Sequence, residues 1–163
     1  MSTETPSALD RPSALDRIII ESAIHRLLAA YAHNLDDGNT GANADLLANA
    51  RFKVVDTVVS GRDAVEHFLK TNLQYHADGT PRTWHSVSNV LIGVDGATTA
   101  RSSCYFTVHQ EASGLPLQPI VTGRYLDTFE LHEGEWRFAS REVQPRLFGE
   151  LGHHVASPFA TEG

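Results

Sequence analysis

The chain has 163 residues, enough for one domain with a substantial hydrophobic core and too few for two comfortable ones. Hydrophobic residues make up 41% of it and charged residues 20%, and no apolar run approaches the roughly 18 residues that span a bilayer, so the composition excludes disordered and membrane-embedded proteins. The net charge of -7, from 13 Lys and Arg against 20 Asp and Glu, disfavours a nucleic-acid partner, because binding a phosphate backbone needs clustered positive charge.

The N-terminal residues predict an arm rather than a targeting signal. Residues 6–11 and 12–17 repeat the hexamer PSALDR, and Glu4 and Asp10 stand where a secretory signal would carry positive charge and an apolar block. We therefore expect a flexible arm over residues 1–13, available to a partner subunit, and a cytoplasmic protein.

The first firm element is a helix that begins between Ser13 and Asp16 and ends at about Leu35. Its apolar residues recur every three or four positions and form one stripe, and Asp16 in the first turn suits the helix dipole. Tyr31 lies on the stripe and Asp36 follows five residues later, so both side chains can point toward the same interior region. Residues 41–50 then predict a short helix, residues 52–59 a strand, and residues 61–73 a third helix.

After a polar loop over residues 75–82, the pattern changes to four strands. They cover about 83–93, 97–112, 117–132 and 135–147, and hairpin signals separate them at Asp95-Gly96, Ser113-Gly114 and Glu133-Gly134. Helices followed by an antiparallel meander predict an α+β domain over residues 14–147, with a tail over 148–163. Helices across a strongly curved sheet make a cone-shaped fold that encloses a pocket for a small apolar ligand.

The strand over residues 83–93 holds His85, Val87, Asn89 and Leu91 in one alternating row. The polar pair His85 and Asn89 is either a satisfied structural feature or part of a lined cavity. If it faces inward, the neighbouring strands offer Tyr105, Thr107 and His109 in one parity, and Arg141 or the alternate Ser140 in the last strand. The sequence leaves the inward parity open.

Cysteine and histidine usage indicates no metal site. The single cysteine, Cys104, lies in an apparently buried strand, which favours an inert small residue over a nucleophile. The nine histidines are scattered, and neither an HExxH pattern nor paired cysteines appear.

Several segments together resemble a known family. They are AIHRLLAAYAHNLDD (residues 23–37), GRDAVEHF (61–68), WHSVSNVLI (84–92), VTGRYLDTFELHEGEWRF (121–138) and SREVQ (140–144). In order and spacing they are similar to the SnoaL-like branch of the nuclear transport factor 2-like superfamily, over roughly residues 14–147. Scytalone dehydratase, bile-acid 7α-dehydratase and hexachlorocyclohexane dehydrochlorinase belong to that superfamily, together with non-catalytic members, so the fold constrains function poorly.

The resemblance implies site residues. The dehydratases and dehydrochlorinases place an aspartate at the end of the first helix and a histidine early in the strand after the third helix, which correspond here to Asp36 and His85. Asp37 competes with Asp36 for the same role. Tyr31 matches a tyrosine of the bile-acid enzyme, Arg141 a basic residue late in the sheet, and His109 a second histidine of scytalone dehydratase. Asn89, His109 and Tyr105 are the expected substrate-pocket residues.

An Asp–His pair of this kind can abstract a proton without a metal or organic cofactor. The carboxylate accepts one imidazole N–H and stabilises the imidazolium that forms, while Tyr31 or Arg141 assists an enolate or a leaving group. We therefore expect Asp36 and His85 within about 2.6–3.2 Å of each other. The expected function is a lyase or isomerase, dehydratase-like, acting on a small hydrophobic alicyclic or aromatic substrate.

Two other functions remain open, the small (β) subunit of an aromatic-ring hydroxylating dioxygenase and a non-catalytic small-molecule binding protein. Arg124 and Tyr125 are interpreted as sheet and interface residues. Because a large apolar sheet face is unfavourable in water, we also expect a homodimer or homotrimer built through the outer face of the meander.

Overall fold

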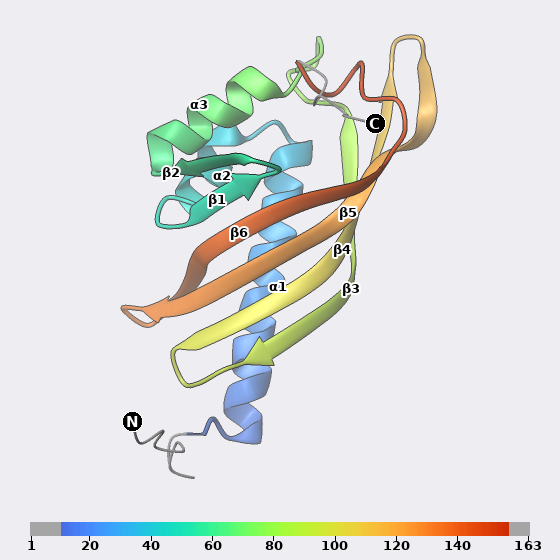
Figure 1. The fold of residues 1–163 in the computed structure, drawn as a ribbon. Helices are drawn as coiled ribbons and strands as arrows, with labels where there is room; N and C mark the ends of the chain where they lie inside the picture. Colours follow the sequence, from blue (N-terminus) through green and yellow to red (C-terminus); the bar gives the residue numbers. More distant parts are fainter. Residues whose placement is uncertain (1–10, 157–163) are drawn as a thin grey trace.

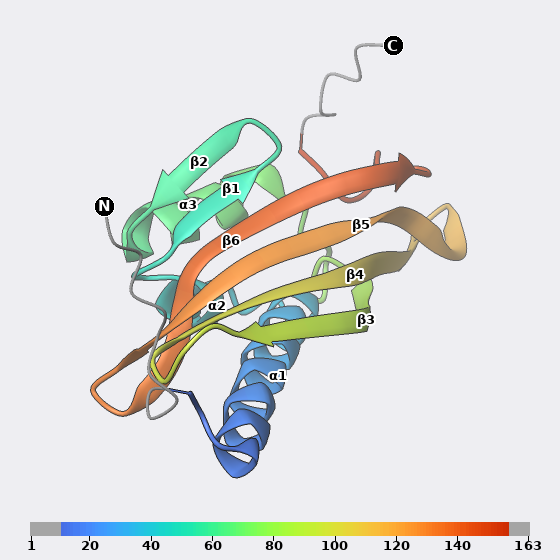
Figure 2. The same ribbon diagram turned by 60° about the horizontal axis from the view of Figure 1, so that its bottom comes forward.

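The structure, a computed structural model, describes residues 11–156. Over this range the helices are α1 (Ala14–Asp36), α2 (Thr40–Leu46) and α3 (Arg62–Asn72). The strands are β1 (Arg51–Val54), β2 (Thr57–Ser60), β3 (Thr83–Val94), β4 (Thr99–Ala112), β5 (Leu115–His132) and β6 (Glu135–Phe148). They form one sheet in the order β2-β1-β6-β5-β4-β3, in which the pairing of β1 with β6 is parallel and the other pairings are antiparallel. The helices lie on one side of this curved sheet (Figures 1 and 2), which confirms the predicted α+β fold.

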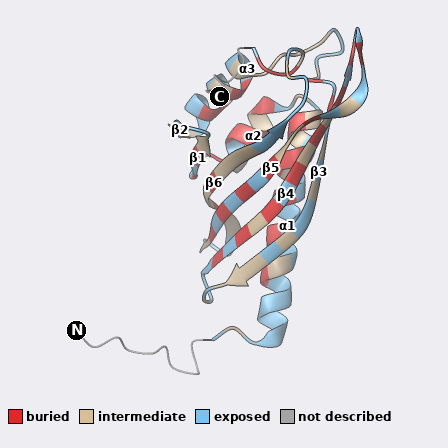
Figure 3. Cartoon of the chain, turned by 45° about the vertical axis from the view of Figure 1, so that its right-hand side comes forward, coloured by how far each residue is buried: buried red, intermediate tan, exposed pale blue. Residues whose placement is uncertain are grey.

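Helix α1 is fixed by its N-cap and by its apolar stripe. The Oγ of Ser13 accepts a hydrogen bond from the backbone N–H of Asp16 at 3.1 Å, and the Asp16 carboxylate accepts one from the Ser13 N–H at 3.0 Å. Such a reciprocal capping box satisfies two backbone donors at the helix start. The first turns project past the sheet and are exposed (Figure 3), whereas the later turns bury the stripe against it. The buried residues are Ile20, Ile24, Leu28, Tyr31, Ala32 and Leu35.

The segment predicted as one strand over residues 52–59 is instead the hairpin of β1 and β2. The chain turns at Val55 and Asp56, and Val55 adopts a positive φ of 54°. Left-handed backbone is rare for a β-branched residue, and no glycine or proline marks the turn. The sequence pattern therefore predicts one continuous strand instead of a hairpin. The hairpin adds β1 to the edge of β6, with Phe52 beside Arg141.

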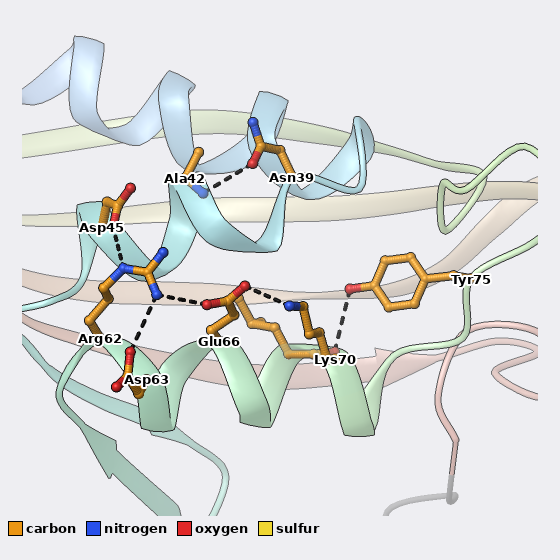
Figure 4. A network of polar contacts seen from close by, with 9 residues as sticks. Asn39, Ala42, Asp45, Arg62, Asp63, Glu66, Lys70 and Tyr75 are labelled. Carbon is orange, nitrogen blue, oxygen red and sulfur yellow. Dashed lines mark hydrogen bonds and ion pairs between the residues drawn. The ribbon is translucent and has the colours of Figure 1, made fainter.

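A network of charges joins α2 to α3 (Figure 4). The Arg62 guanidinium donates to Asp45 at 2.6 Å and to Glu66 at 2.7 Å, and Lys70 donates to the other oxygen of Glu66 at 2.6 Å. Exposed ion pairs add little stability singly, whereas Val65 and Leu69 of α3 are buried in the core.

The residues that follow β6 fold back over the end of α3. The backbone N–H of Gln74 donates to the carbonyl of His154 at 2.8 Å, and the N–H of Ala156 donates to the carbonyl of Asn72 at 3.0 Å. Leu73 and Val155 form an isolated antiparallel bridge. Residues 149–156, which the sequence assigns to a tail, therefore pack against the domain. The arm predicted over residues 1–13 lies mostly outside the described residues.

Candidate active site

An apolar cavity lies between α1, α3, the inner face of the sheet and the C-terminal segment. Its volume is about 110 Å³, and most of its wall is apolar. A few polar side chains interrupt this wall. The lining residues are Tyr31, Leu35, Phe52, Val54, Phe68, Leu69, Asn72, Leu73, Pro81, His85, Phe106, Val108, Val121, Tyr125, Val143, Pro145, Phe148, Leu151, His154 and Val155.

Asp36, the last residue of α1, is joined to the start of β3 by three hydrogen bonds. Its Oδ1 accepts from the hydroxyl of Thr83 at 2.8 Å, and its Oδ2 accepts from the backbone N–H of His85 at 2.8 Å. The third bond joins Asp36 Oδ1 to Nδ1 of the His85 ring at 2.5 Å. The predicted approach of Asp36 and His85 is therefore confirmed in geometry.

These bonds set the charge of Asp36 and the tautomer of His85. Burial alone would raise the pKa of Asp36, but the hydrogen bonds from His85 and Thr83 and the charge of His85 outweigh it and lower the pKa. An ionised carboxylate only accepts, so Nδ1 of His85 carries the proton of this bond, and in the neutral form of the ring the lone pair is on Nε2. The His85 side chain is 6% exposed and lies on the cavity wall. Its Nε2 is the basic atom available to a ligand.

Asp37 does not share this position. It is the C-cap residue of α1, where its backbone N–H donates to the carbonyl of His33 at 2.9 Å, and it is exposed. The choice between the two aspartates, left open by the sequence, is settled in favour of Asp36.

Two tyrosines form another part of the cavity wall. Tyr31 from α1 meets Tyr125 from β5 edge to face with ring centroids 5.7 Å apart, and Tyr125 stacks on Phe106 at 4.4 Å. Burial raises the pKa of Tyr31 to about 12 and that of Tyr125 well above 10, so both phenols are neutral hydrogen-bond donors. Tyr31 was predicted here, but the interpretation of Tyr125 as an interface residue was wrong because it lies on the inward row of β5.

Arg141 lies behind the two tyrosines and does not line the cavity. Its side chain is 0% exposed, and its guanidinium carbon lies 4.0 Å from the Tyr31 ring centroid and 3.9 Å from that of Tyr125. The Nε of Arg141 is 3.6 Å from Oδ1 of Asp127, and none of its three guanidinium nitrogens has a hydrogen-bond partner among residues 11–156. The predicted direct contact of Arg141 with substrate is therefore wrong in this structure.

Three predicted pocket residues lie elsewhere. Asn89 has a φ of 52° and sits in a β-bulge between Ser88 and Leu91. Because the bulge adds one residue, the inward-facing positions are odd-numbered before it, as at His85, and even-numbered after it, as at Val90. Asn89 is therefore exposed.

Tyr105 and His109 are displaced for a different reason. Strand β4 alternates regularly, and its even-numbered residues, such as Phe106 and Val108, face inward. Tyr105 and His109 therefore lie on the outer face, where Tyr105 is 42% exposed. The sequence left open which residues of β4 face inward, and the structure shows the even-numbered ones, so neither Tyr105 nor His109 lines the cavity.

His154 is a polar pocket residue that the sequence analysis missed. It is 8% exposed and lines the cavity together with Leu151 and Val155, all from the segment taken as a tail. The apolar residues at positions 151 and 155, four apart around a histidine pair, were the available signal that this segment packs inward.

Cys104 faces the core from β4, and burial raises the pKa of its thiol to about 11. This fits the predicted inert role. Among residues 11–156, no group of three or more His, Cys, Asp and Glu side chains is placed to hold a metal ion. In the same part of the chain, none of the helices has the length and apolar character needed to cross a membrane.

Comparison with known proteins supports the fold. The SnoaL-like domain family matches residues 16–142. A putative scytalone dehydratase from Novosphingobium aromaticivorans is 21% identical, with a TM-score of 0.70 over 91% of this chain and 98% of that one. Hexachlorocyclohexane dehydrochlorinase LinA-type3 from Novosphingobium barchaimii is 19% identical, with a TM-score of 0.68 over 90% of this chain and 100% of that one.

A third similar structure is the β subunit of a putative aromatic-ring-hydroxylating dioxygenase from N. aromaticivorans. It is 20% identical, with a TM-score of 0.67 over 82% of this chain and 93% of that one. No curated protein matches the sequence. At these identities the structural matches establish a shared fold and leave function to the site.

Proposed function

The chain belongs to the SnoaL-like domain family of the nuclear transport factor 2-like superfamily, and we propose that it is a cofactor-independent lyase or isomerase acting on a small hydrophobic alicyclic or aromatic molecule. One observation carries this proposal. His85 lies on the wall of a largely apolar cavity with its Nδ1 2.5 Å from Oδ1 of Asp36, which leaves Nε2 of His85 as a base.

The proposed reaction begins with proton transfer from carbon. Nε2 of His85 takes a proton from a carbon next to a carbonyl group or an activated ring position, and Asp36 stabilises the resulting imidazolium through Nδ1–H. In an elimination, the electrons of the broken C–H bond form a C=C bond while the neighbouring hydroxide or halide leaves with its own pair. His85 then gives its proton to the hydroxide leaving group or to water. In an isomerisation, His85 returns the proton to a different carbon.

The tyrosines supply the proposed electrophilic assistance. A neutral phenol donates a hydrogen bond to an enolate oxygen or a leaving group, and such a bond is stronger in an apolar site that excludes water. Tyr31 and Tyr125 both line the cavity and stay protonated at neutral pH because burial raises their pKa values. Arg141, stacked on both rings, would act through them rather than on the substrate.

The test is a screen of hydroxylated and halogenated alicyclic and aromatic compounds for elimination or isomerisation at pH 7–8. For any compound that is turned over, His85→Ala should lower kcat/KM by about 10² to 10⁴ because the base is lost. His109→Ala is the matched control, since that histidine lies on the outer sheet face, and it should leave the rate within about twofold.

The screen also separates the alternatives. A dioxygenase β-subunit role predicts no turnover and co-purification with a larger iron–sulfur subunit. A non-catalytic binder predicts a ligand recovered unchanged. Turnover that survives His85→Ala would reject the Asp–His mechanism.

We also propose that the chain forms a homodimer or homotrimer through the outer face of the sheet. The helices lie on the opposite face (Figures 1 and 2), and large apolar side chains of β3 are exposed. Trp84 is 69% exposed and Leu91 is 74% exposed, on the same strand. Light scattering at micromolar concentration should give a multiple of 17.8 kDa, and Trp84→Glu should reduce it. A monomeric mass for the unmodified protein would contradict this assembly.

A further inference from the structure

The C-terminal segment places a second histidine, His154, on the cavity wall. Its side chain is 8% exposed, and the ring nitrogen Nδ1 has no hydrogen-bond partner among the described residues 11–156. A buried polar atom without a partner destabilises the folded state, so such atoms are rare unless a ligand or water pairs with them.

The fold holds His154 in place through its backbone and leaves the imidazole unused. Its carbonyl accepts from the N–H of Gln74 at 2.8 Å, and its own N–H donates to the carbonyl of Leu151 at 2.9 Å. The carbonyl of the preceding His153 accepts from the side-chain amide of Gln110 at 2.9 Å. These bonds fix the segment, and none of them needs the His154 ring.

The His154 ring is suited to hydrogen bonding rather than to proton transfer. Burial, and then the nearby His85, lowers its pKa to about 4, against the weaker opposing effect of Asp36. A neutral imidazole carries one N–H donor and one lone pair, so it can bind a hydroxyl or a carbonyl oxygen. At neutral pH the ring is therefore a weak base that can still donate and accept a hydrogen bond.

The size of the cavity limits what can lie against this ring. Its volume of about 110 Å³ is comparable with the roughly 150 Å³ engineered cavity that admits benzene. A single six-membered ring with one small substituent fits this space better than fused rings do.

We propose that His154 is a specificity-determining residue that hydrogen-bonds the oxygen of a single-ring alcohol, phenol or ketone in the cavity. The proposal rests on the proposed function, since the same ring would present its carbon to His85. A site built to bond an oxygen rejects the analogue that lacks it, because the polar atom is then left unpaired. His154 thus selects oxygenated rings over hydrocarbon rings of the same size.

The experiment compares the binding of phenol and toluene, which have nearly the same shape, by calorimetry or ligand-detected NMR. The wild-type protein should bind phenol more tightly. His154→Leu should weaken phenol binding about 3- to 10-fold, the loss of one neutral hydrogen bond, and leave toluene binding unchanged or tighter. His153→Leu is the matched control, because that ring does not line the cavity, and it should preserve the preference.

His154→Gln keeps a hydrogen-bonding group and should restore most of the phenol preference, which also covers the case in which the leucine variant folds poorly. Equal loss of phenol and toluene binding in His154→Leu, or failure of the wild-type protein to bind either ring at millimolar concentration, would overturn the proposal. Binding is measured without turnover. If phenol binding depends on His154 but no compound in the screen is turned over, the proposed function alone is rejected. If a compound is turned over at the same rate with and without His154, this proposal alone is rejected.

Discussion

The domain contains two acid–base pairs that differ in almost every physical respect. Asp36 meets His85, which lines the cavity, and its carboxylate accepts three hydrogen bonds of 2.5–2.8 Å. Asp127 and Arg141 meet in the core with both side chains 0% exposed, and their closest N–O approach is 3.6 Å. The only side-chain hydrogen bond to Asp127 within the described residues comes from Ser102 at 3.4 Å.

Their pKa shifts have opposite signs for this reason. Burial raises the pKa of both carboxyl groups, but only at Asp36 do hydrogen bonds and charge outweigh it. At Asp127 burial dominates over Arg141 and Ser102, and the pKa rises to about 6. The direction of each shift therefore follows from how fully hydrogen bonds and a nearby charge together offset the burial of the carboxylate. The satisfied pair is suited to catalysis, while the unsatisfied pair supports the tyrosine wall.

The largest effect is expected where the first pair is broken. Asp36→Asn keeps the shape of the side chain but removes the charge that supports the imidazolium, so its rate loss should approach the ~10² to 10⁴ expected for His85→Ala. The double variant should be scarcely slower than the slower single variant, because base function is lost only once. The measurement is kcat/KM on a substrate from the screen. If the rate loss of the double variant equals the product of the two single losses, the two residues act independently and the dyad is contradicted.

Breaking the second pair should affect stability instead. Arg141→Met leaves Asp127 buried without a counter-charge and should lower the free energy of unfolding by about 3–5 kcal/mol. The loss should be smaller at pH 5 than at pH 8, because an unpaired Asp127 escapes its charge by taking a proton. Urea denaturation at the two pH values measures both effects.

The control for this prediction replaces both members of the pair. Asp127→Leu combined with Arg141→Met exchanges the ions for apolar side chains and should recover most of the lost stability, because neither charge remains unpaired. A double variant as unstable as Arg141→Met alone would show that the ion pair itself holds the core together.

The two pairs also differ in how far the sequence could predict them. The helix end at Asp36 and the strand start before His85 are local signals that a period and a turn can locate, whereas the pairing of the two residues was implied by the resemblance to the SnoaL-like branch. Asp127 was not anticipated, because its partner across the sheet depends on a register that the meander pattern does not specify. The sequence pattern thus located the two elements, and the family resemblance assigned the pair at their boundaries.

Errors in the predicted pocket have equally specific causes. The bulge at Asn89 shifts the inward row of β3 by one residue without a glycine to announce it. The sequence did not determine whether the odd- or even-numbered residues of β4 face inward, and Tyr105 and His109 were assigned to the pocket on the odd choice. A one-residue change moves every side chain to the other face. His154 was missed because the long-range contacts of residues 149–156 with the end of α3 leave only a weak local pattern.

The third prediction concerns how the free energy of unfolding depends on pH through the buried His154, which lies near Asp36 and His85. Its pKa falls from 6.5 to about 4 on folding, so between these values the unfolded chain binds a proton that the folded chain does not. The free energy of unfolding therefore decreases as the pH is lowered through this range, by up to about 3 kcal/mol at roughly 1.4 kcal/mol per pKa unit.

His154→Gln isolates this contribution. The raised pKa of Asp127 acts in the opposite direction, because the folded chain binds the extra proton between 3.8 and about 6, but it is common to both proteins and cancels in their difference. The wild-type protein should therefore lose stability relative to His154→Gln as the pH falls from 7 to 4. A difference that does not change with pH would mean that His154 titrates normally.

The smallest effect is expected at Tyr31, which touches both regions, because its ring lies 4.0 Å from the Arg141 guanidinium and also lines the cavity. Tyr31→Phe removes one hydroxyl and keeps the ring, so the contact with Arg141 persists and the free energy of unfolding should change by less than about 1 kcal/mol. Activity should fall about tenfold, the loss of roughly one neutral hydrogen bond, if the hydroxyl assists the leaving group or enolate, which is less than for His85→Ala. Tyr125→Phe is the matched control, since Arg141 lies 3.9 Å from that ring as well. A loss in Tyr31→Phe alone would assign the donor to Tyr31, a loss in Tyr125→Phe alone would assign it to Tyr125, and an unchanged rate in both would limit the tyrosines to packing against Arg141.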